Sequence, residues 1–205
     1  MGENDKITVY ARSVVEEGGT RYFLARYEGQ KYLGITGDGA EGFEGKRHSS
    51  AGPFLCSLTP SNAAVLREHF SWLCPQTLGL KTSAGCGDRL GLATPGHIRA
   101  VRAVGGMQPI LAQQSIREME RTQRTPEDVI NDATWGVLEE GWRFGYGADA
   151  DHLKNTHDVD ICVAAGFTFY TFDPREHVDV AQRRRDGEHH PAEDLRIHLG
   201  TQRLF

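Results

Sequence analysis

The chain has 205 residues, of which 39% are hydrophobic and 25% charged, and its formal net charge is −5. This composition is ordinary for a soluble globular protein, and it excludes the basic field that attracts nucleic acid or an anionic membrane surface. Residues 1–5 lack the features of a signal peptide, and no apolar run reaches the roughly 18 residues needed to span a bilayer. We therefore expect a cytoplasmic protein with no nucleic-acid or membrane partner.

Residues 1–58 show the patterns of a small β-rich subdomain. Three runs alternate apolar and polar residues in the manner of exposed strands and are separated by turn clusters: 7–10, 21–27 and 31–35. A glycine-rich loop follows at 37–50, and 54–58 is a candidate for one more strand. We expect an antiparallel meander in this part of the chain.

From residue 59 onward, short apolar runs alternate with helical patterns. Helices are predicted to begin at Thr59-Pro60, Thr94-Pro95 and Thr125-Pro126, because threonine caps a helix and proline suits its first turn. A fourth helix is predicted over 157–165. Strands are predicted at 77–82, 109–112, 144–148 and 166–172. Strands alternating with helices indicate an α/β fold with a parallel sheet.

Polar residues follow each predicted strand. They form four groups: Gly85-Cys86-Gly87-Asp88-Arg89, Gln113-Gln114-Ser115, Asp149-Ala150-Asp151-His152 and Asp173-Pro174. In a parallel sheet these four places lie along one edge, where such folds build their sites. The sequence therefore predicts a polar site at that edge.

The strongest chemistry belongs to Asp151 and His152. A carboxylate beside a neutral imidazole can bind a divalent metal, and a carboxylate can also act as a base. The alternative is that Asp151 caps a loop and His152 forms only a structural hydrogen bond.

Arg89 could pair with a substrate carboxylate, or instead with Asp88 or another acid at the edge. Gln113 and Gln114 could donate to sugar hydroxyls, or could tie loops together. The glycine-rich segment 85–91 lacks the register and the lysine of nucleotide-binding loops, so nucleotide is not expected. Asp88, Arg89, Gln113 and Gln114 are therefore candidates for contacting a substrate.

Four stretches together resemble the tagaturonate/fructuronate epimerase family: 85–97, 109–118, 132–136 and 147–154. The resemblance extends from about Cys56 to Val178. It implies a (β/α) TIM-type barrel enzyme of hexuronate metabolism that uses a divalent metal cation, with Zn, Mn and Ni not distinguished. It also implies a small sugar acid as substrate, since the family interconverts D-tagaturonate and D-fructuronate.

By the same resemblance, Asp151 would be the proton acceptor and His152 a metal ligand, with Asp149 and Asp88 supporting or lining the site. Members of the family are much longer, and their remaining metal ligands and proton donor correspond to positions beyond residue 205. The implied organisation is a β-rich subdomain over 1–58 and an incomplete first half of a barrel over 59–205. We expect this chain alone to be inactive and to self-associate.

The reaction path stays open. The inverted carbon lies β to the ketone, so a base on its hydroxyl could start a retro-aldol cleavage, with the metal polarising the ketone. Direct proton or hydride transfer at that carbon is the other path. The alternative functions are a metal-dependent aldolase or isomerase acting on a sugar or sugar phosphate, and a non-catalytic fragment.

Overall fold

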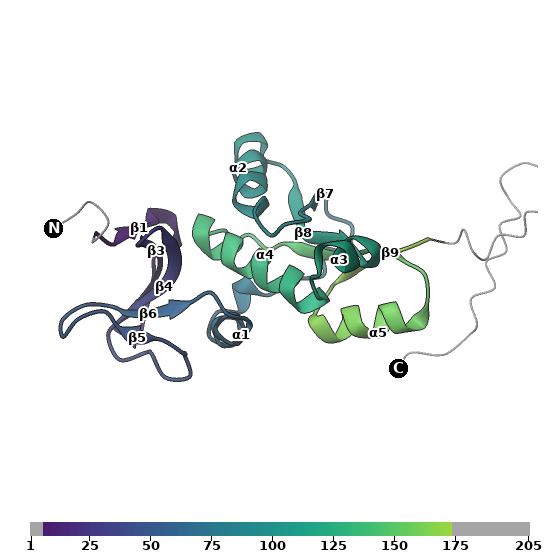
Figure 1. Cartoon of the computed structure of the whole chain (residues 1–205). Coiled ribbons are helices and arrows are strands. Elements are labelled where there is room, and N and C mark those ends of the chain that lie inside the picture. The colour runs from purple at the N-terminus through teal and green to yellow at the C-terminus, as the bar shows by residue number, and fades with distance from the viewer. Residues whose placement is uncertain (1–5, 174–205) are drawn as a thin grey trace, which may run out of the picture. The chain divides into compact units, whose positions relative to one another are not determined.

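The structure is a computed structural model that describes residues 6–173, which lie within one compact unit. These residues form two β-sheets with helices packed around the second one (Figure 1). In Figure 1 the strands of the first sheet are purple to blue, and those of the second run from teal to yellow-green. No helix in this range is both long enough and apolar enough to cross a membrane.

The first sheet is antiparallel and built around one hairpin. Its central strands, β3 (Thr20–Tyr27) and β4 (Gln30–Thr36), are joined by Glu28 and Gly29, which have φ angles of 49° and 79°. Positive φ at both residues matches the right-handed twist of the strands. The outer strands are β1 (Thr8–Val9), β2 (Val15–Glu17), β5 (Lys46–Arg47) and β6 (Phe54–Ser57). The predicted antiparallel meander is confirmed; β2 and β5 were not predicted.

The second sheet is parallel. Its strands stand in the order β10-β9-β8-β7, and they are β7 (Ser83–Gly87), β8 (Gln108–Ser115), β9 (Gly147–Leu153) and β10 (Phe169–Phe172). Each neighbouring pair is parallel, which confirms the prediction of strands that alternate with helices. A mixed α/β fold with one antiparallel and one parallel sheet is therefore established.

Two strand predictions were misplaced. The predicted strand at 77–82 is wrong, because β7 lies just after it, over Ser83–Gly87, and overlaps the glycine-rich segment 85–91. Glycine leaves room there for the Gln113 amide, since a Cβ atom on Gly85 would lie 2.7 Å from Oε1 of Gln113. The strand predicted at 144–148 begins and ends later, so Asp149, Asp151 and His152 belong to β9 itself.

The helices follow the predicted starting signals. The predicted ones are α1 (Pro60–His69), α2 (Thr94–Val104), α4 (Pro126–Glu140) and α5 (Thr156–Ala165). A fifth, α3 (Ile116–Thr122), was not predicted, although Ser115 and Glu118 cap it reciprocally. Short 3-10 turns, η2 (Ala11–Ser13) and η3 (Ser71–Leu73), connect other elements.

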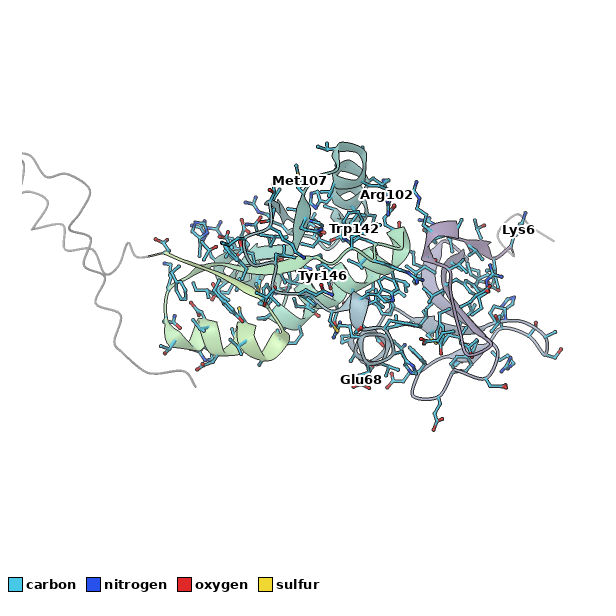
Figure 2. The ribbon with its side chains drawn as sticks, turned by 180° about the vertical axis from the view of Figure 1, so that it is seen from behind. Lys6, Glu68, Arg102, Met107, Trp142 and Tyr146 are labelled. Atoms are coloured by element: carbon cyan, nitrogen blue, oxygen red, sulfur yellow. The ribbon has the colours of Figure 1, made fainter. Side chains whose placement is uncertain are left out.

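Helix α4 holds the unit together. It lies between α1 and α2 (Figure 1), and it contacts β8 of the parallel sheet and β3 of the antiparallel one. Gly136 permits the close approach to α2, because a Cβ atom there would be 2.5 Å from Cγ2 of Thr94. Tyr146, labelled in Figure 2, is fully buried nearby and donates its hydroxyl to the Leu73 carbonyl at 2.7 Å.

Three arginines surround Glu140 at the end of α4. Its carboxylate accepts from Nη1 of Arg12 at 2.7 Å, of Arg99 at 2.6 Å and of Arg102 at 2.9 Å. Arg102 also lies over the Trp142 ring, 5.7 Å from its centroid (Figure 2). Because Arg12 belongs to η2, this cluster ties the antiparallel part to α2 and α4. The predicted domain boundary after residue 58 falls in the connection from β6 to α1 and stays a prediction.

Candidate functional site

An open cavity of about 630 Å³ lies at the carboxyl ends of β7, β8 and β9. Its lining combines polar residues from these strands with the segment between β7 and α2, and consists of Gly87, Asp88, Arg89, Leu90, Leu92, Ala93, Gln113, Glu118 and Asp151. The structure thus brings together Asp88, Arg89, Gln113 and Asp151, four of the six candidate site residues. Asp173 is not among the lining residues; its N–H donates to the Leu153 carbonyl at 2.9 Å.

Asp88 organises the segment that precedes α2. Its buried carboxylate accepts the backbone N–H groups of Leu92 at 3.1 Å, Ala93 at 2.8 Å and Thr94 at 3.2 Å, with Leu90 at 3.3 Å. Burial by itself would raise the pKa of this carboxyl, but the four N–H donors hold the pKa below its ordinary value. Asp88 therefore shapes the cavity wall, and a direct contact with substrate stays a prediction.

Arg89 projects from the same segment and is paired with an acid. Its side chain is 71% exposed, and its Nη2 atom contacts Oε1 of Glu118. Of the two alternatives for Arg89, the structure shows a pairing with an acid at the edge, and that acid is Glu118. Glu118 was missed as a cavity residue, although its capping signature with Ser115 was visible in the sequence.

Gln113 and Asp149 form a connected pair beneath the cavity. Nε2 of Gln113 donates to Oδ2 of Asp149 at 2.8 Å, and the Thr171 hydroxyl donates to Oδ1 of the same carboxylate at 3.0 Å. Burial raises the pKa of the Asp149 carboxyl, and the two hydrogen bonds oppose that rise. These two hydrogen bonds connect residues of β8, β9 and β10. Thr171 was not anticipated, because one threonine in an apolar strand carries no distinctive pattern.

Gln114 faces away from the cavity. It is 1% exposed, its Oε1 accepts from Nη1 of Arg124, and its Nε2 donates to Oγ1 of Thr122 at 3.1 Å. The structure thus gives Gln114 the role of tying β8 to the segment around α3, which was the alternative for the two glutamines. Adjacent residues of a strand point to opposite faces, so only one of the pair can line the cavity.

Asp151 and His152 contact each other at the end of β9. Nδ1 of His152 lies 2.7 Å from Oδ1 of Asp151, and the histidine side chain is 55% exposed. His152 has a φ angle of 55°, a left-handed conformation that is uncommon outside glycine. This conformation interrupts the regular pleat, and such irregularities are concentrated at functional sites.

The Asp151–His152 pair fits one part of a metal site. A carboxylate that accepts from Nδ1–H leaves the Nε2 lone pair for a metal ion, which is the usual arrangement behind a ligating histidine. Within residues 6–173, no group of three or more histidine, cysteine or acidic side chains is placed to hold a metal ion. Catalytic zinc sites commonly have three protein ligands. The described residues therefore supply only a partial ligand set.

Comparison with known proteins gives consistent matches. A family model described as tagaturonate epimerase matches residues 10–197. A tagaturonate/fructuronate epimerase from Thermotoga maritima is 45% identical over 174 residues, which cover 83% of this chain and 36% of that protein. The native crystal structure of the fructuronate-tagaturonate epimerase from Cohnella laeviribosi superposes with a TM-score of 0.82 at 41% identity, covering 87% of this chain and 36% of the other. This chain thus spans about a third of the length of the relatives it matches.

Proposed function

The chain belongs to the tagaturonate epimerase family, and from this premise we propose that its cavity is part of the site at which D-tagaturonate and D-fructuronate are interconverted. The observation that carries the proposal is the convergence of Asp151 and Gln113 with the Asp88–Arg89 segment on one cavity. These residues come from three separate strand ends. Such convergence is how parallel α/β folds assemble a site for a small polar molecule.

We also propose that β7 to β10 are part of a (β/α) TIM-type barrel. The four strands are parallel and neighbour one another in chain order, with helices in each connection. A barrel of this kind needs eight strands, and its active site lies at the carboxyl ends of the strands. The cavity lies at those ends of β7, β8 and β9, which supports the proposal.

In the proposed site, Asp151 accepts the proton of the substrate hydroxyl at the carbon to be inverted. His152 offers Nε2 to a divalent cation, which when bound supplies Lewis-acid polarisation of the ketone. Arg89, at the open mouth, is placed to exchange its pairing with Glu118 for the substrate carboxylate. Retro-aldol cleavage and direct proton or hydride transfer are both compatible with this arrangement. The cytoplasmic location stays a prediction.

The described part of the cavity offers few groups that would bind a sugar phosphate. Helix N-termini bind phosphate through their N–H groups, but those at the start of α2 already donate to Asp88. Arg89 is the single cation among the cavity-lining residues within 6–173, and it is paired with Glu118. A dianionic phosphate would therefore find few donors here, whereas a single carboxylate matches one guanidinium.

The test is binding and turnover with manganese, zinc or nickel present. Saturation-transfer NMR should show that both keto acids bind and that an aldose uronate of the same carbon number binds more weakly. Because the described ligand set is partial, metal affinity should be weak, so binding is the primary readout and fructuronate is followed by chromatography.

Two substitutions examine the assigned residues. Asp151→Asn and His152→Ala should weaken metal-dependent binding by about tenfold or more, the range found when metal-site partners are removed. Asp160→Asn and His157→Ala, at exposed positions of α5, are matched controls. If the chain binds neither keto acid in the presence of manganese, zinc or nickel, the proposed function is wrong.

A further inference from the structure

Asp149 is buried and does not itself line the cavity, yet it touches a residue that does. We propose that Asp149 is a positioning residue that fixes the direction of the Gln113 amide, so that the Gln113 carbonyl oxygen faces the substrate and accepts a hydrogen bond from a substrate hydroxyl. The inference rests on the proposed function, since it names how that site reads its substrate. It concerns Gln113, Asp149, Thr171 and Gly85, which we call the amide row.

The direction follows from what each atom can donate. An ionised carboxylate only accepts hydrogen bonds, so the group of Gln113 that lies 2.8 Å from Oδ2 of Asp149 must be its NH₂. The other oxygen, Oδ1, is engaged by the Thr171 hydroxyl at 3.0 Å, which holds the carboxylate from its far side. This bond turns the amide nitrogen toward Asp149 and uses one of its two N–H groups, so Oε1 is the atom that we assign to the cavity that Gln113 lines.

The backbone keeps the amide in this place. Oε1 of Gln113 lies where a Cβ of residue 85 would come within 2.7 Å, so the amide packs directly over Gly85. In β8, Ala112 has a φ angle of 51°, and the pairing with β9 shifts register between Leu111 and Gln114. Such a bulge re-aims the next side chain. Gln113 is thus directed over β7 and β9 by glycine on one side and an irregular strand on the other.

A polar row in this position needs a compensating reason. Barrel interiors are normally filled by branched apolar residues, and burying a carboxylate is unfavourable unless hydrogen bonds satisfy it. Here the row lies beside the cavity, next to Asp151, which is also an acceptor when ionised. Two acceptors that face one cavity favour a ligand that brings two hydroxyl donors. The site should therefore reject analogues that lack a hydroxyl opposite Gln113.

The first experiment tests the amide direction without any substrate. In the full chain labelled with ¹⁵N-glutamine, the side-chain signals of Gln113 are identified by their loss in Gln113→Glu. We expect one amide proton to be shifted downfield and protected from exchange, and to lose both properties in Asp149→Asn. Asp160→Asn is the matched control. Signals that are unaffected by Asp149→Asn would overturn the inference.

The second experiment exchanges donor and acceptor. In the double variant Gln113→Glu with Asp149→Asn, the new amide donates to the new carboxylate, and an acceptor oxygen still faces the cavity. Each single substitution should weaken tagaturonate binding by about 10- to 100-fold, whereas the double variant should recover to within about fivefold of the original chain. Thr171→Val, which removes only the hydroxyl on Oδ1, should give a smaller loss of about threefold to tenfold.

The outcomes separate the two proposals. A double variant as weak as the product of the single effects would overturn the positioning role even if the original chain binds tagaturonate. If the original chain binds neither keto acid, the proposed function fails and the substrate contact of Gln113 fails with it. The NMR result then still decides whether Asp149 directs the amide.

Discussion

At the scale of single residues, the carboxylate of Asp88 replaces a conventional helix cap. Ala93, the N-cap residue of α2, has no polar side chain, and Asp88 instead accepts the N–H groups of Ala93 and Thr94 from five and six residues upstream. The negative charge also lies at the positive end of the helix dipole. This one side chain therefore sets both the start of α2 and the course of the cavity wall.

We expect Asp88→Asn to lower the free energy of unfolding by about 1–3 kcal/mol at pH 7, because several hydrogen bonds to a charge are weakened. The pKa of Asp88 is below its ordinary value of 3.8, so its stabilisation is present above that pH and is lost as the pH falls through the lowered pKa. Urea unfolding at pH 7 and at pH 3 measures the difference, with Asp38→Asn, at an exposed position, as control. An equal difference at both pH values would contradict the role of the charge.

His152 allows backbone strain to be separated from metal binding. Both His152→Ala and His152→Gly remove the imidazole and should abolish its share of metal affinity. Only glycine adopts a φ of 55° without a penalty, so the glycine variant should be more stable than the alanine variant by about 1 kcal/mol. Thermal unfolding and metal titration of the two variants measure these effects. Equal stability would show that the left-handed conformation is not maintained.

Sequence reasoning found four of the nine residues that line the cavity, but not what each one does. Arg89 and Gln113 were expected at the strand ends because polar residues interrupt apolar runs there, and both line the cavity. Patterns cannot show that Asp88 is occupied by backbone N–H groups or that Gln114 points away. Those facts depend on the bulge at Ala112 and on the path of the chain after β7, neither of which leaves a periodic signal.

At the scale of elements, α4 combines a strong local signal with a buried ionic cluster. Thr125 and Asp128 cap its start reciprocally, and Gly141 ends it in a left-handed conformation. Near that end, Glu140 is 5% exposed and faces Arg12, Arg99 and Arg102. The cluster joins three elements through one carboxylate.

We expect Glu140→Gln to destabilise the chain by about 2–3 kcal/mol, below the full effect of breaking a buried pair because the arginines are partly exposed. Burial would raise the pKa of Glu140, but the three arginines hold it below its ordinary value of 4.5. Its stabilisation should therefore be present above pH 4.5 and disappear as the pH falls through the lowered pKa.

Denaturant unfolding from pH 7 down to pH 3 tests this expectation. The matched control is the neighbouring Glu139→Gln, whose pairing with Lys31 is more exposed and should contribute about 0–1 kcal/mol. Similar effects of the two substitutions at pH 7 would show that the arginine cluster contributes no more than an ordinary surface pair.

Elements with explicit start signals were predicted well, and elements without them were not. The Thr-Pro pairs at 59, 94 and 125 each mark the start of a helix; Thr59 and Thr125 are the N-cap residues of α1 and α4, whereas Thr94 is the first residue of α2. β7 was missed because its small residues, Ser83 to Gly87, look like a loop while serving to let Gln113 pack over the strand. β9 was placed too early, since the inward carboxylates of Asp149 and Asp151 break the apolar pattern by which buried strands are recognised.

At the scale of the molecule, the parallel sheet ends in two edges, β7 and β10. Phe169 and Phe172 on β10 are 51% and 62% exposed, and Leu90 and Leu92 beyond β7 are 68% and 78% exposed. Strand edges flanked by exposed apolar side chains favour pairing with other chains. The self-association expected from the sequence is thus given a specific surface, and stays a prediction.

We expect Phe172→Lys to reduce self-association, because a charge on an edge strand opposes strand pairing. Light scattering coupled to size-exclusion chromatography, over a range of concentrations, measures the apparent mass. Val163→Lys introduces the same charge at an exposed apolar position of α5 and should leave the mass unchanged. A mass insensitive to Phe172→Lys would place any association elsewhere.

The parallel sheet could be predicted from residue patterns, but the barrel and the reaction could not. Alternating patterns were enough to predict a parallel sheet of strands that alternate with helices, although two of its strands were misplaced. Closure into a barrel and the identity of a keto sugar acid came from the family resemblance. No local physical rule converts an aspartate and a histidine at a strand end into a choice of substrate. The proposed hydrogen bond from a substrate hydroxyl to Gln113 is the first structural feature that restricts the choice of substrate.

Because of the bulge in β8, the site depends on the number of residues in that strand as well as on which residues they are. Gln113 and Gln114 are the same amino acid, yet one meets the cavity and the other is locked against Arg124. Losing one residue at Ala112 would turn every later side chain of the strand to the opposite face, and a glutamine would still occupy the cavity position. Two sequences aligned one place out of step would therefore look alike at this site. To decide whether an insertion or deletion before Gln113 changes the site, one should therefore ask which of the two glutamines contacts Arg124.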